Sequence, residues 1–179
     1  MYKLISSKVY YEGKVLKLQV DEIEYETTKN KGIREIAIHP GGAVIVPITD
    51  EGKLVLVKQF RYPLQNDLIE FPAGKLDKNE DPLICAKREL EEETGYSSDK
   101  ISYLGKIYTA PGYCTELLNI FVAENLKSGN HNREEGEKEM QILELSLSEI
   151  IELIKEEQIV DSKTISALFF LKLKGIIKF

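Results

Sequence analysis

The segment from Gly74 to Tyr96 reads Gly74-Lys-Leu-Asp-Lys-Asn-Glu-Asp-Pro-Leu-Ile-Cys-Ala-Lys-Arg-Glu-Leu-Glu-Glu-Glu-Thr-Gly-Tyr96, in a chain of 179 residues. Asp81 followed by Pro82 is typical of a helix start, because an aspartate side chain accepts from the first backbone N–H groups and proline suits the first helical position. Gly95 is the residue type expected just beyond a helix end. The segment therefore predicts one short helix over about residues 82–94, preceded by a loop.

Glu89, Glu92 and Glu93 fall on one face of this predicted helix, because residues three and four apart are neighbours on a helix. Like charges at these spacings destabilise a helix by roughly 0.2–0.5 kcal/mol per pair, and a bound cation would reverse that sign. Clustered carboxylates suit hard ions, and Mg²⁺ prefers a few of them together with waters and substrate phosphates. The cluster predicts metal-assisted chemistry on a phosphate. The alternative is a solvated acidic face with Arg88 paired to Glu91 or Glu92.

The spacing of these residues resembles the Nudix box, the signature of Nudix hydrolases. Its consensus is G-x5-E-x7-R-E-U-x-E-E-x-G-U, where U is a bulky aliphatic residue. All seven invariant letters are matched in register over 23 residues, which makes the solvated acidic face the weaker alternative. Tyr96 is the one departure from the consensus, because it stands where an aliphatic residue is usual.

The resemblance implies a role for each conserved letter of the box. Glu89, Glu92 and Glu93 match the glutamates that hold a divalent metal, which we expect to be Mg²⁺ with Mn²⁺ able to substitute. Metal ions that bridge two phosphates polarise phosphorus and lower the pKa of bound water. The backbone carbonyl of Ala73 is implied as a further metal ligand, and Arg88 as the residue that orients the glutamates. Glu80 either pairs with Arg88 or has another function. Gly74 is expected to permit a tight turn.

Segments outside the box are similar to the ADP-ribose pyrophosphatase subfamily. Gln59-Phe-Arg-Tyr-Pro63 and Glu70-Phe-Pro-Ala-Gly74 resemble its lead-in to the box. Two further segments add to the likeness: the loop Pro111-Gly-Tyr-Cys-Thr-Glu116, whose proline lies 16 residues after Gly95 as in that subfamily, and Asp161-Ser-Lys-Thr164 near the end of the chain.

The likeness also implies a substrate-binding set, which consists of Arg61, Glu70, Arg34, Pro111 and Glu116. Arg61 suits a phosphate because a guanidinium offers bidentate donors to phosphate oxygens; the alternative is a surface charge at a strand edge. A tyrosine of the N-terminal region, or Phe60, is expected to stack on the adenine.

Residues 130–139 read Asn130-His-Asn-Arg-Glu-Glu-Gly-Glu-Lys-Glu139, which lacks apolar periodicity and indicates a loop. In ADP-ribose pyrophosphatases the loop at this place supplies a glutamate that acts on the attacking water. Such a general base must come within hydrogen-bond reach of that water. We expect Glu137 to have this role, with Glu139 and then Glu135 as alternatives. Glu92 and Arg88 complete the catalytic set.

Apolar patterns predict the remaining elements. Leu16, Leu18 and Val20 alternate with polar residues, which predicts a half-buried strand within residues 14–25. The apolar runs 43–48 and 54–57, joined by Thr49-Asp-Glu-Gly-Lys53, predict a hairpin. Further expected elements are strands near 68–71, 101–109, 117–123 and 140–145, and helices at about 147–156 and 162–175, the second capped by Asp161 or Ser162.

The composition predicts a globular protein without nucleic-acid or membrane partners. A net charge of −6 and a pI near 5.2 argue against a general nucleic-acid binder, which shows a basic stripe. Cys85 and Cys114 are too few for a disulfide framework and are expected to be reduced thiols. The absence of a signal-like N-terminus and of an apolar run of spanning length favours a cytoplasmic location.

The order of the elements favours an α+β protein with a mixed sheet packed between helices. The Nudix resemblance implies the α/β/α sandwich of that family over residues 41–179. Residues 1–40 are expected to be a small N-terminal strand region, with His39-Pro-Gly-Gly42 as a boundary or an ordinary turn. This region is too short to bury both of its faces, so we expect a homodimer in which it helps to build the partner's substrate pocket, as the resemblance also implies.

Three functions are compatible with these patterns. The favoured one is Mg²⁺-dependent hydrolysis of ADP-ribose to AMP and ribose 5-phosphate. The second keeps the chemistry on another nucleoside diphosphate derivative, such as a nucleotide sugar, a dinucleotide or an oxidised nucleotide. The third is a catalytically silent module that binds ADP-ribose as a sensor, which the intact metal glutamates disfavour.

Overall fold

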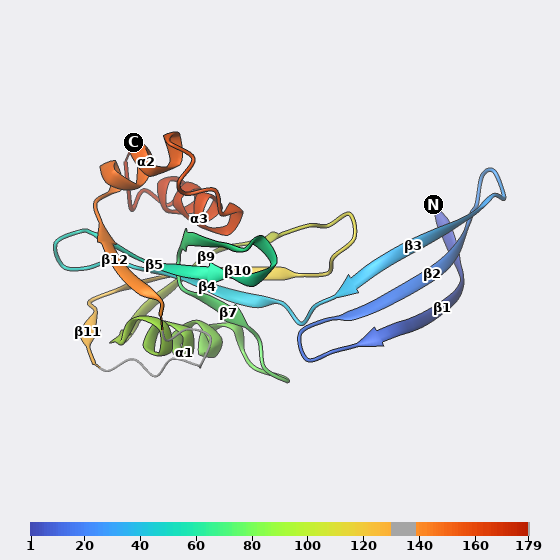
Figure 1. Cartoon of the computed structure of the whole chain (residues 1–179), viewed down its shortest axis with the longest axis horizontal. Coiled ribbons are helices and arrows are strands. Elements are labelled where there is room, and N and C mark those ends of the chain that lie inside the picture. The colour runs from blue at the N-terminus through green and yellow to red at the C-terminus, as the bar shows by residue number, and fades with distance from the viewer. Residues whose placement is uncertain (130–138, 179) are drawn as a thin grey trace. The chain divides into compact units, whose positions relative to one another are not determined.

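The computed structural model describes residues 1–129 and 139–178, and Figure 1 traces the chain. The backbone divides into two compact units. The first consists of residues 1–41 with 108–117, and the second of residues 42–107 with 118–179. Each unit has its own sheet structure.

The first unit is a three-stranded antiparallel sheet with a loop joined to its last strand. The strands are β1 (Tyr2–Glu12), β2 (Lys17–Tyr25) and β3 (Lys31–Ile38), in the order β1-β2-β3. The loop within 108–117 joins β3 through a bridge between Ala37 and Cys114, with Ala37 N–H donating to the Tyr113 carbonyl at 2.7 Å.

The sheet of the first unit leaves many apolar side chains exposed. The predicted strand over 14–25 is confirmed as β2, but Leu16 and Leu18 are both exposed rather than half-buried. Every residue of β1 is exposed. The large apolar side chains that this sheet exposes include Tyr2, Leu4, Val9, Tyr10, Tyr11 and Ile33. A sheet with this surface has apolar area that the single chain does not cover.

The second unit contains three small sheets. A four-stranded sheet has the order β7 (Ala73–Lys75), β4 (Gly42–Pro47), β10 (Leu117–Glu124) and β9 (Lys100–Tyr108), with β4 parallel to β10 and antiparallel to β7. An antiparallel sheet has the order β12 (Gln141–Leu145), β5 (Leu54–Arg61) and β6 (Asn66–Glu70). A short pair joins β11 (Lys127–Ser128) to β8 (Tyr96–Ser97).

Strand β4 shows why the second unit has helices on both sides of its sheets. Successive side chains of a strand point to opposite faces. Val44 and Val46 pack into a cluster with residues of α2 (Leu147–Lys155) and α3 (Ser162–Leu173). Ala43 and Ile45 pack with the apolar residues of α1 (Pro82–Thr94). Both faces are therefore covered, which gives the expected α/β/α arrangement, with α1 on one side and α2 and α3 on the other (Figure 1).

Caps are present at the helix ends, including those predicted at Asp81, Gly95 and Asp161. Asp81 Oδ1 accepts from the backbone N–H of Leu83 at 2.8 Å, and Gly95 closes α1 with φ = 74°. Both bounds of the predicted helix 82–94 are confirmed. Ser146 and Glu149 form a capping box on α2, and Asp161 is the residue that caps α3. Among the described residues, no helix is long and apolar enough to cross a membrane.

The predicted hairpin between residues 43–48 and 54–57 is wrong as a strand pairing. The turn itself forms, with Gly52 N–H donating to the Thr49 carbonyl at 2.9 Å. Beyond one antiparallel bridge between Ile48 and Leu54, however, β4 and β5 belong to different sheets. Each of these buried strands finds partners elsewhere in the chain, which a local apolar pattern does not specify.

Candidate active site

Arg88, a half-buried residue of α1, is the centre of the acidic segment. Its Nη1 donates to Glu89 Oε1 at 2.6 Å and to Glu92 Oε2 at 3.0 Å. Its Nε and Nη2 each donate to Glu80 at 3.1 Å, and Nη2 also donates to the Lys75 carbonyl at 3.2 Å. One guanidinium therefore joins the helix carboxylates to the loop that precedes the helix.

The protonation states of these groups follow from the same contacts. The hydrogen bond to Glu80 is the largest cause that raises the pKa of Arg88, so the guanidinium stays charged. The reciprocal bond from Arg88, together with a bond from Asp77 N–H, lowers the pKa of Glu80. Glu80 is therefore held as a carboxylate whose two oxygens join the loop to the helix.

Gly74 lies directly against the carboxylate of Glu89. A Cβ built on Gly74 would lie 1.7 Å from Glu89 Oε1 and 2.0 Å from its carboxyl carbon. The absence of a side chain at residue 74 is therefore what allows Glu89 to occupy its place. Cys85 lies behind this contact, fully buried, with its Sγ 3.6 Å from the Gly74 carbonyl. Burial is the main cause that raises the pKa of this thiol to about 12, so it is unreactive.

The carboxylates of the acidic helix fit a hard divalent cation by their chemistry. Glu89 and Glu93 are buried, with 6% and 2% of their surface exposed, whereas Glu91 is exposed. Burying carboxylates is unfavourable unless cations or donors compensate them. Within the described residues, no group of three or more acidic, histidine or cysteine side chains is already arranged to hold a metal ion. Glu89 and Glu92 are instead paired with Arg88.

A second charged network lies at the end of β5 and β6. Arg61 Nε donates to Glu70 Oε1 at 2.6 Å, and Lys163 Nζ contacts Glu70 Oε2. Lys163 also pairs with Asp161 Oδ1 at 3.0 Å. The Thr164 hydroxyl accepts from Phe71 N–H at 3.0 Å and donates to Asp161 at 2.7 Å. The network joins both strands to the start of α3.

Arg61 also lies in the electrostatic field of the acidic helix. Burial acts to lower its pKa, but the hydrogen bond and charge of Glu70, with the charges of Glu93 and Asp161, raise it overall. Arg61 thus carries a permanent positive charge close to the carboxylates of the box.

The first unit contains the other polar candidates. Arg34 Nη2 donates to the hydroxyl of Tyr25 at 2.6 Å. Glu116 Oε2 accepts from the hydroxyl of Thr109 at 2.8 Å, and Glu116 Oε1 lies 3.4 Å from His39 Nδ1. These contacts hold Arg34 beside β2 and hold Glu116 against the end of β3.

The sequence from residue 39 to residue 168 matches the family model described as the NUDIX domain. The chain belongs to the Nudix family. Nudix hydrolases generally use divalent metal ions, in agreement with the donor chemistry of the acidic helix.

Several relatives match almost the whole chain. It is 40% identical over 173 residues to the ADP-ribose pyrophosphatase of Bacillus subtilis (strain 168), covering 96% of this chain and 93% of the relative. It is 41% identical to the methanol dehydrogenase activator of Bacillus methanolicus, covering 98% and 95%, and 33% identical to the GDP-mannose pyrophosphatase of Cronobacter sakazakii (strain ATCC BAA-894), covering 97% and 96%. The crystal structure of an ADP compounds hydrolase has the same fold, with a TM-score of 0.85, 22% identity and coverage of 98% and 97%.

The expected site residues divide between the two units. Those in the second unit are Ala73, Arg88, Glu89, Glu92 and Glu93 of the Nudix box region, with Arg61 and Glu70 beside them. Those in the first unit are Arg34, Pro111 and Glu116. Glu139 is exposed just before β12, while Glu135 and Glu137 lie outside the described residues.

Two contacts escaped the sequence analysis. The contact of Lys163 with Glu70 joins residues 93 positions apart. A lysine in the first turn of a helix is electrostatically unfavourable, and this was the sequence signal for such a contact. Tyr96, the one departure from the Nudix consensus, donates its hydroxyl to Glu144 of β12 at 2.5 Å. A tyrosine hydroxyl after the box thus joins the end of α1 to a distant strand.

Replacement of Gly74 by alanine is expected to lower activity more than stability. The new methyl group would displace the Glu89 carboxylate, which sits at the end of a flexible side chain, so the cost to folding is small. Hydrolysis should fall at least about tenfold, in line with the loss of one oriented metal ligand or its support. Steady-state kinetics and thermal unfolding would measure the two effects.

Gly52→Ala is the matched control. Gly52 has φ = 77° with no atom within 4 Å of an added Cβ, so alanine there costs about 1 kcal/mol of backbone strain and leaves the box untouched. A G74A variant with full activity, or one that loses activity only in proportion to its loss of folded protein, would contradict the account of Gly74.

Tyr96 is expected to titrate far above an ordinary tyrosine. The hydrogen bond to Glu144, followed by burial, raises the pKa of Tyr96 to about 12. The stabilisation by this bond is therefore complete below about pH 10 and lost as the pH rises through about 12. Glu144→Gln should move the Tyr96 midpoint down toward 10. Tyrosine Cζ NMR would measure it, with Y96F to assign the signal; equal midpoints with and without Glu144 would refute this cause.

Proposed function

We propose that this chain hydrolyses the pyrophosphate bond of ADP-ribose to AMP and ribose 5-phosphate, with Mg²⁺ as its metal and Mn²⁺ as a substitute. The observation that carries the proposal is the intact Arg88 assembly, in which one guanidinium holds the loop glutamate and two helix glutamates of the box. The full-length similarity to a bacterial ADP-ribose pyrophosphatase supports the choice of substrate.

Glu89, Glu92, Glu93 and the carbonyl of Ala73 are the groups that we propose to hold the metal. A divalent ion in this place would neutralise charge on the diphosphate and lower the pKa of the attacking water. Gly74 leaves the space in which the Glu89 carboxylate lies. Arg88 fixes one oxygen of Glu89 and one of Glu92, which limits how far either carboxylate can turn.

Arg61 is proposed to meet the diphosphate. Its Nε is taken by Glu70, and Nη1 and Nη2 have no other partner among the described residues. Four N–H donors of a permanently charged group therefore remain for phosphate oxygens. The proposed base for the attacking water is Glu137, with Glu139 and Glu135 as alternatives. Gln141 pairs with Lys58 on β5, so Glu139 precedes β12 at the end of the sheet where Arg61 lies.

Other nucleoside diphosphate derivatives are the second candidate substrates. The relatives named as GDP-mannose pyrophosphatases share 33–34% identity with this chain, and the proposed metal and Arg61 would serve any diphosphate. The higher identity to the ADP-ribose pyrophosphatase favours ADP-ribose. A silent sensor is disfavoured because its sequence would have no need to keep four box glutamates and their arginine.

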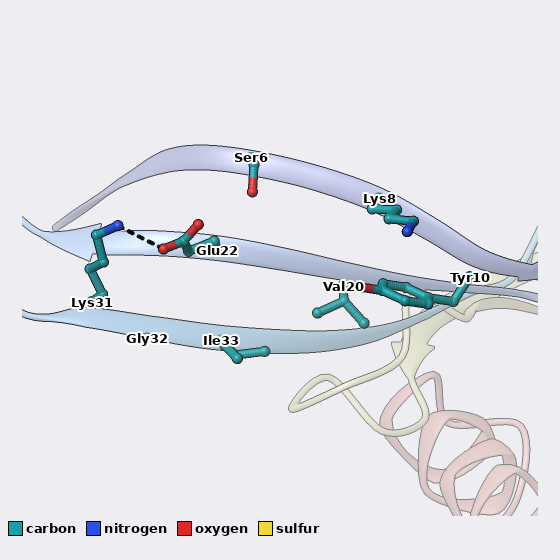
Figure 2. A pocket seen from close by; sticks show the side chains of 8 residues that line it. All are labelled: Ser6, Lys8, Tyr10, Val20, Glu22, Lys31, Gly32 and Ile33. Atoms are coloured by element: carbon teal, nitrogen blue, oxygen red, sulfur yellow. Dashed lines mark hydrogen bonds and ion pairs between the residues drawn. The ribbon is translucent and has the colours of Figure 1, made fainter.

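We also propose a homodimer built on the first unit, in which each N-terminal sheet covers apolar surface of the other and contributes Arg34 or a tyrosine to a substrate pocket. One face of the sheet forms an open hollow of about 480 Å³, lined from β1 to β3 by Ser6, Lys8, Tyr10, Val20, Glu22, Lys31, Gly32 and Ile33 (Figure 2). The Lys31–Glu22 pair at 2.9 Å and the exposed Tyr10 and Ile33 give this face mixed charged and apolar character, which suits a self-complementary contact.

Substitution of Glu93 tests the proposed function. Glu93→Gln keeps the volume of the side chain but removes a charge from the proposed metal site, so turnover of ADP-ribose should fall about 100-fold or more. Glu91→Gln on the same helix is exposed and should retain activity. Products from a panel of ADP-ribose, GDP-mannose and dinucleotides, with Mg²⁺ or Mn²⁺, would be separated by chromatography. Unchanged turnover in both E92Q and E93Q, or no hydrolysis of any compound by the wild type, would refute the proposal.

Sedimentation equilibrium tests the proposed dimer. The wild-type chain should sediment as a dimer at micromolar concentration. Ile33→Glu places a charge on the exposed sheet face and should produce monomers with weakened substrate binding. Leu173→Glu, an equally exposed apolar position on α3, should remain dimeric. A wild-type monomer with full ADP-ribose hydrolysis would rule out the shared pocket.

A further inference from the structure

Lys163 occupies a place that a helix alone does not favour. It lies in the first turn of α3, where the positive end of the helix dipole repels a cation by typically 0.3–1 kcal/mol. Its side chain is only 13% exposed, so its charge has also lost most of its contact with water. Both effects disfavour a charged lysine at this position. The contacts of Lys163 with Glu70 and with Asp161 Oδ1 at 3.0 Å must offset them.

Glu70 is the residue that Lys163 reaches across 93 positions. Its side chain is 1% exposed, and its two oxygens have different partners: Oε1 accepts from Arg61, and Oε2 contacts Lys163. A buried carboxylate with both oxygens engaged has little means to contact a substrate itself. Its effect on a reaction would therefore pass through the cations that it holds.

Arg61 is the more exposed of the two cations that Glu70 holds. Its side chain is 36% exposed, and Glu70 binds it through Nε, which fixes the plane of the guanidinium and leaves Nη1 and Nη2 for other acceptors. The direction of those donors depends on where Glu70 Oε1 lies. A carboxylate turns as one rigid group, so the position of Oε1 depends in turn on what holds Oε2.

We propose that Lys163 is a positioning residue for diphosphate binding: it holds one oxygen of Glu70, so that the other aims the guanidinium of Arg61 at the phosphates. The inference rests on the proposed function in taking the ligand to be a nucleoside diphosphate. It assigns Glu70 a role through Arg61 rather than a direct contact with substrate.

The local structure allows Lys163 to be changed without loss of α3. The helix cap uses Asp161 Oδ2, which accepts from Thr164 N–H at 2.9 Å and from its hydroxyl at 2.7 Å, whereas Lys163 pairs with Oδ1. Lys163→Met keeps an unbranched side chain of similar length. Glu70 then still has Arg61, and the cap is intact.

A double-mutant cycle between Lys163 and Arg61 tests the inference. The affinity for ADP in the presence of Mg²⁺ would be measured by calorimetry, which needs no turnover, alongside kcat and KM for ADP-ribose. Lys163→Met should weaken ADP binding about tenfold, the scale of one lost charged hydrogen bond. In an Arg61→Gln background the same change should have almost no further effect. Lys58→Met is the control, because it breaks an exposed ion pair, Lys58–Asp67, between β5 and β6. It should change neither the affinity for ADP nor the kinetic constants for ADP-ribose.

The outcomes separate the two proposals. Equal ADP affinity in the wild type and K163M, or the same loss from K163M with and without Arg61, would overturn the positioning role and leave Lys163 a structural ion pair. A wild type that binds ADP with the predicted coupling but hydrolyses no diphosphate would refute the proposed function alone. Thermal unfolding of each variant would give its folded fraction, by which the measured affinities and rates would be corrected.

Discussion

The site depends on the hydrogen bonds that the guanidinium of Arg88 donates to the surrounding glutamates. Helix α1 carries four glutamates within five residues, and their mutual repulsion opposes both the helix and the burial of Glu89 and Glu93. Arg88 donates to two of these glutamates and, through Glu80 and the Lys75 carbonyl, to the preceding loop. One planar cation thus compensates the helix and sets the distance between loop and helix. Loss of Arg88 would therefore change how these carboxylates are arranged.

The opposite side of α1 explains why the helix can carry this charge. Cys85, Ala86 and Leu90 are completely buried against Ala43 and Ile45 of β4, so apolar contacts fix the helix on its sheet. Complete burial of one leucine side chain contributes about 1.5–3 kcal/mol, more than the roughly 0.2–0.5 kcal/mol that repulsion costs for each pair of neighbouring glutamates on a helix. Gly74 adds a steric constraint from β7, since only hydrogen at that position leaves room for the Glu89 carboxylate. The apolar contacts on one face of α1 therefore offset the charge repulsion between the glutamates on the other.

Local signals predicted α1 well because its caps, its charged face and its spacing all lie within 23 residues. Asp81 and Gly95 form their capping hydrogen bonds with residues two and four positions away, Leu83 and Glu91. The pairing of β4 and β5 failed as a prediction because each buried strand chooses partners by contacts far along the chain. For the same reason, the contacts of Lys163 with Glu70 and of Tyr96 with Glu144 could not be predicted: the residues around a lysine or a tyrosine in the sequence do not indicate a partner far along the chain. The exposed apolar residues of β1 show a further limit, since the alternation of residues in the sequence does not show which strands stay uncovered.

In the proposed function, Arg88 prepares the glutamates of α1 for a divalent cation by orienting them. Its charge alone would repel such an ion. Electron paramagnetic resonance titration of Mn²⁺ into the wild type and Arg88→Met separates these two effects, with circular dichroism to confirm the fold. Orientation predicts that R88M binds Mn²⁺ about 10-fold to 100-fold more weakly, the usual cost of losing a residue that supports metal ligands. Tighter or unchanged Mn²⁺ binding in a folded R88M variant would show that charge repulsion outweighs or cancels any orienting effect, and would contradict this role of Arg88.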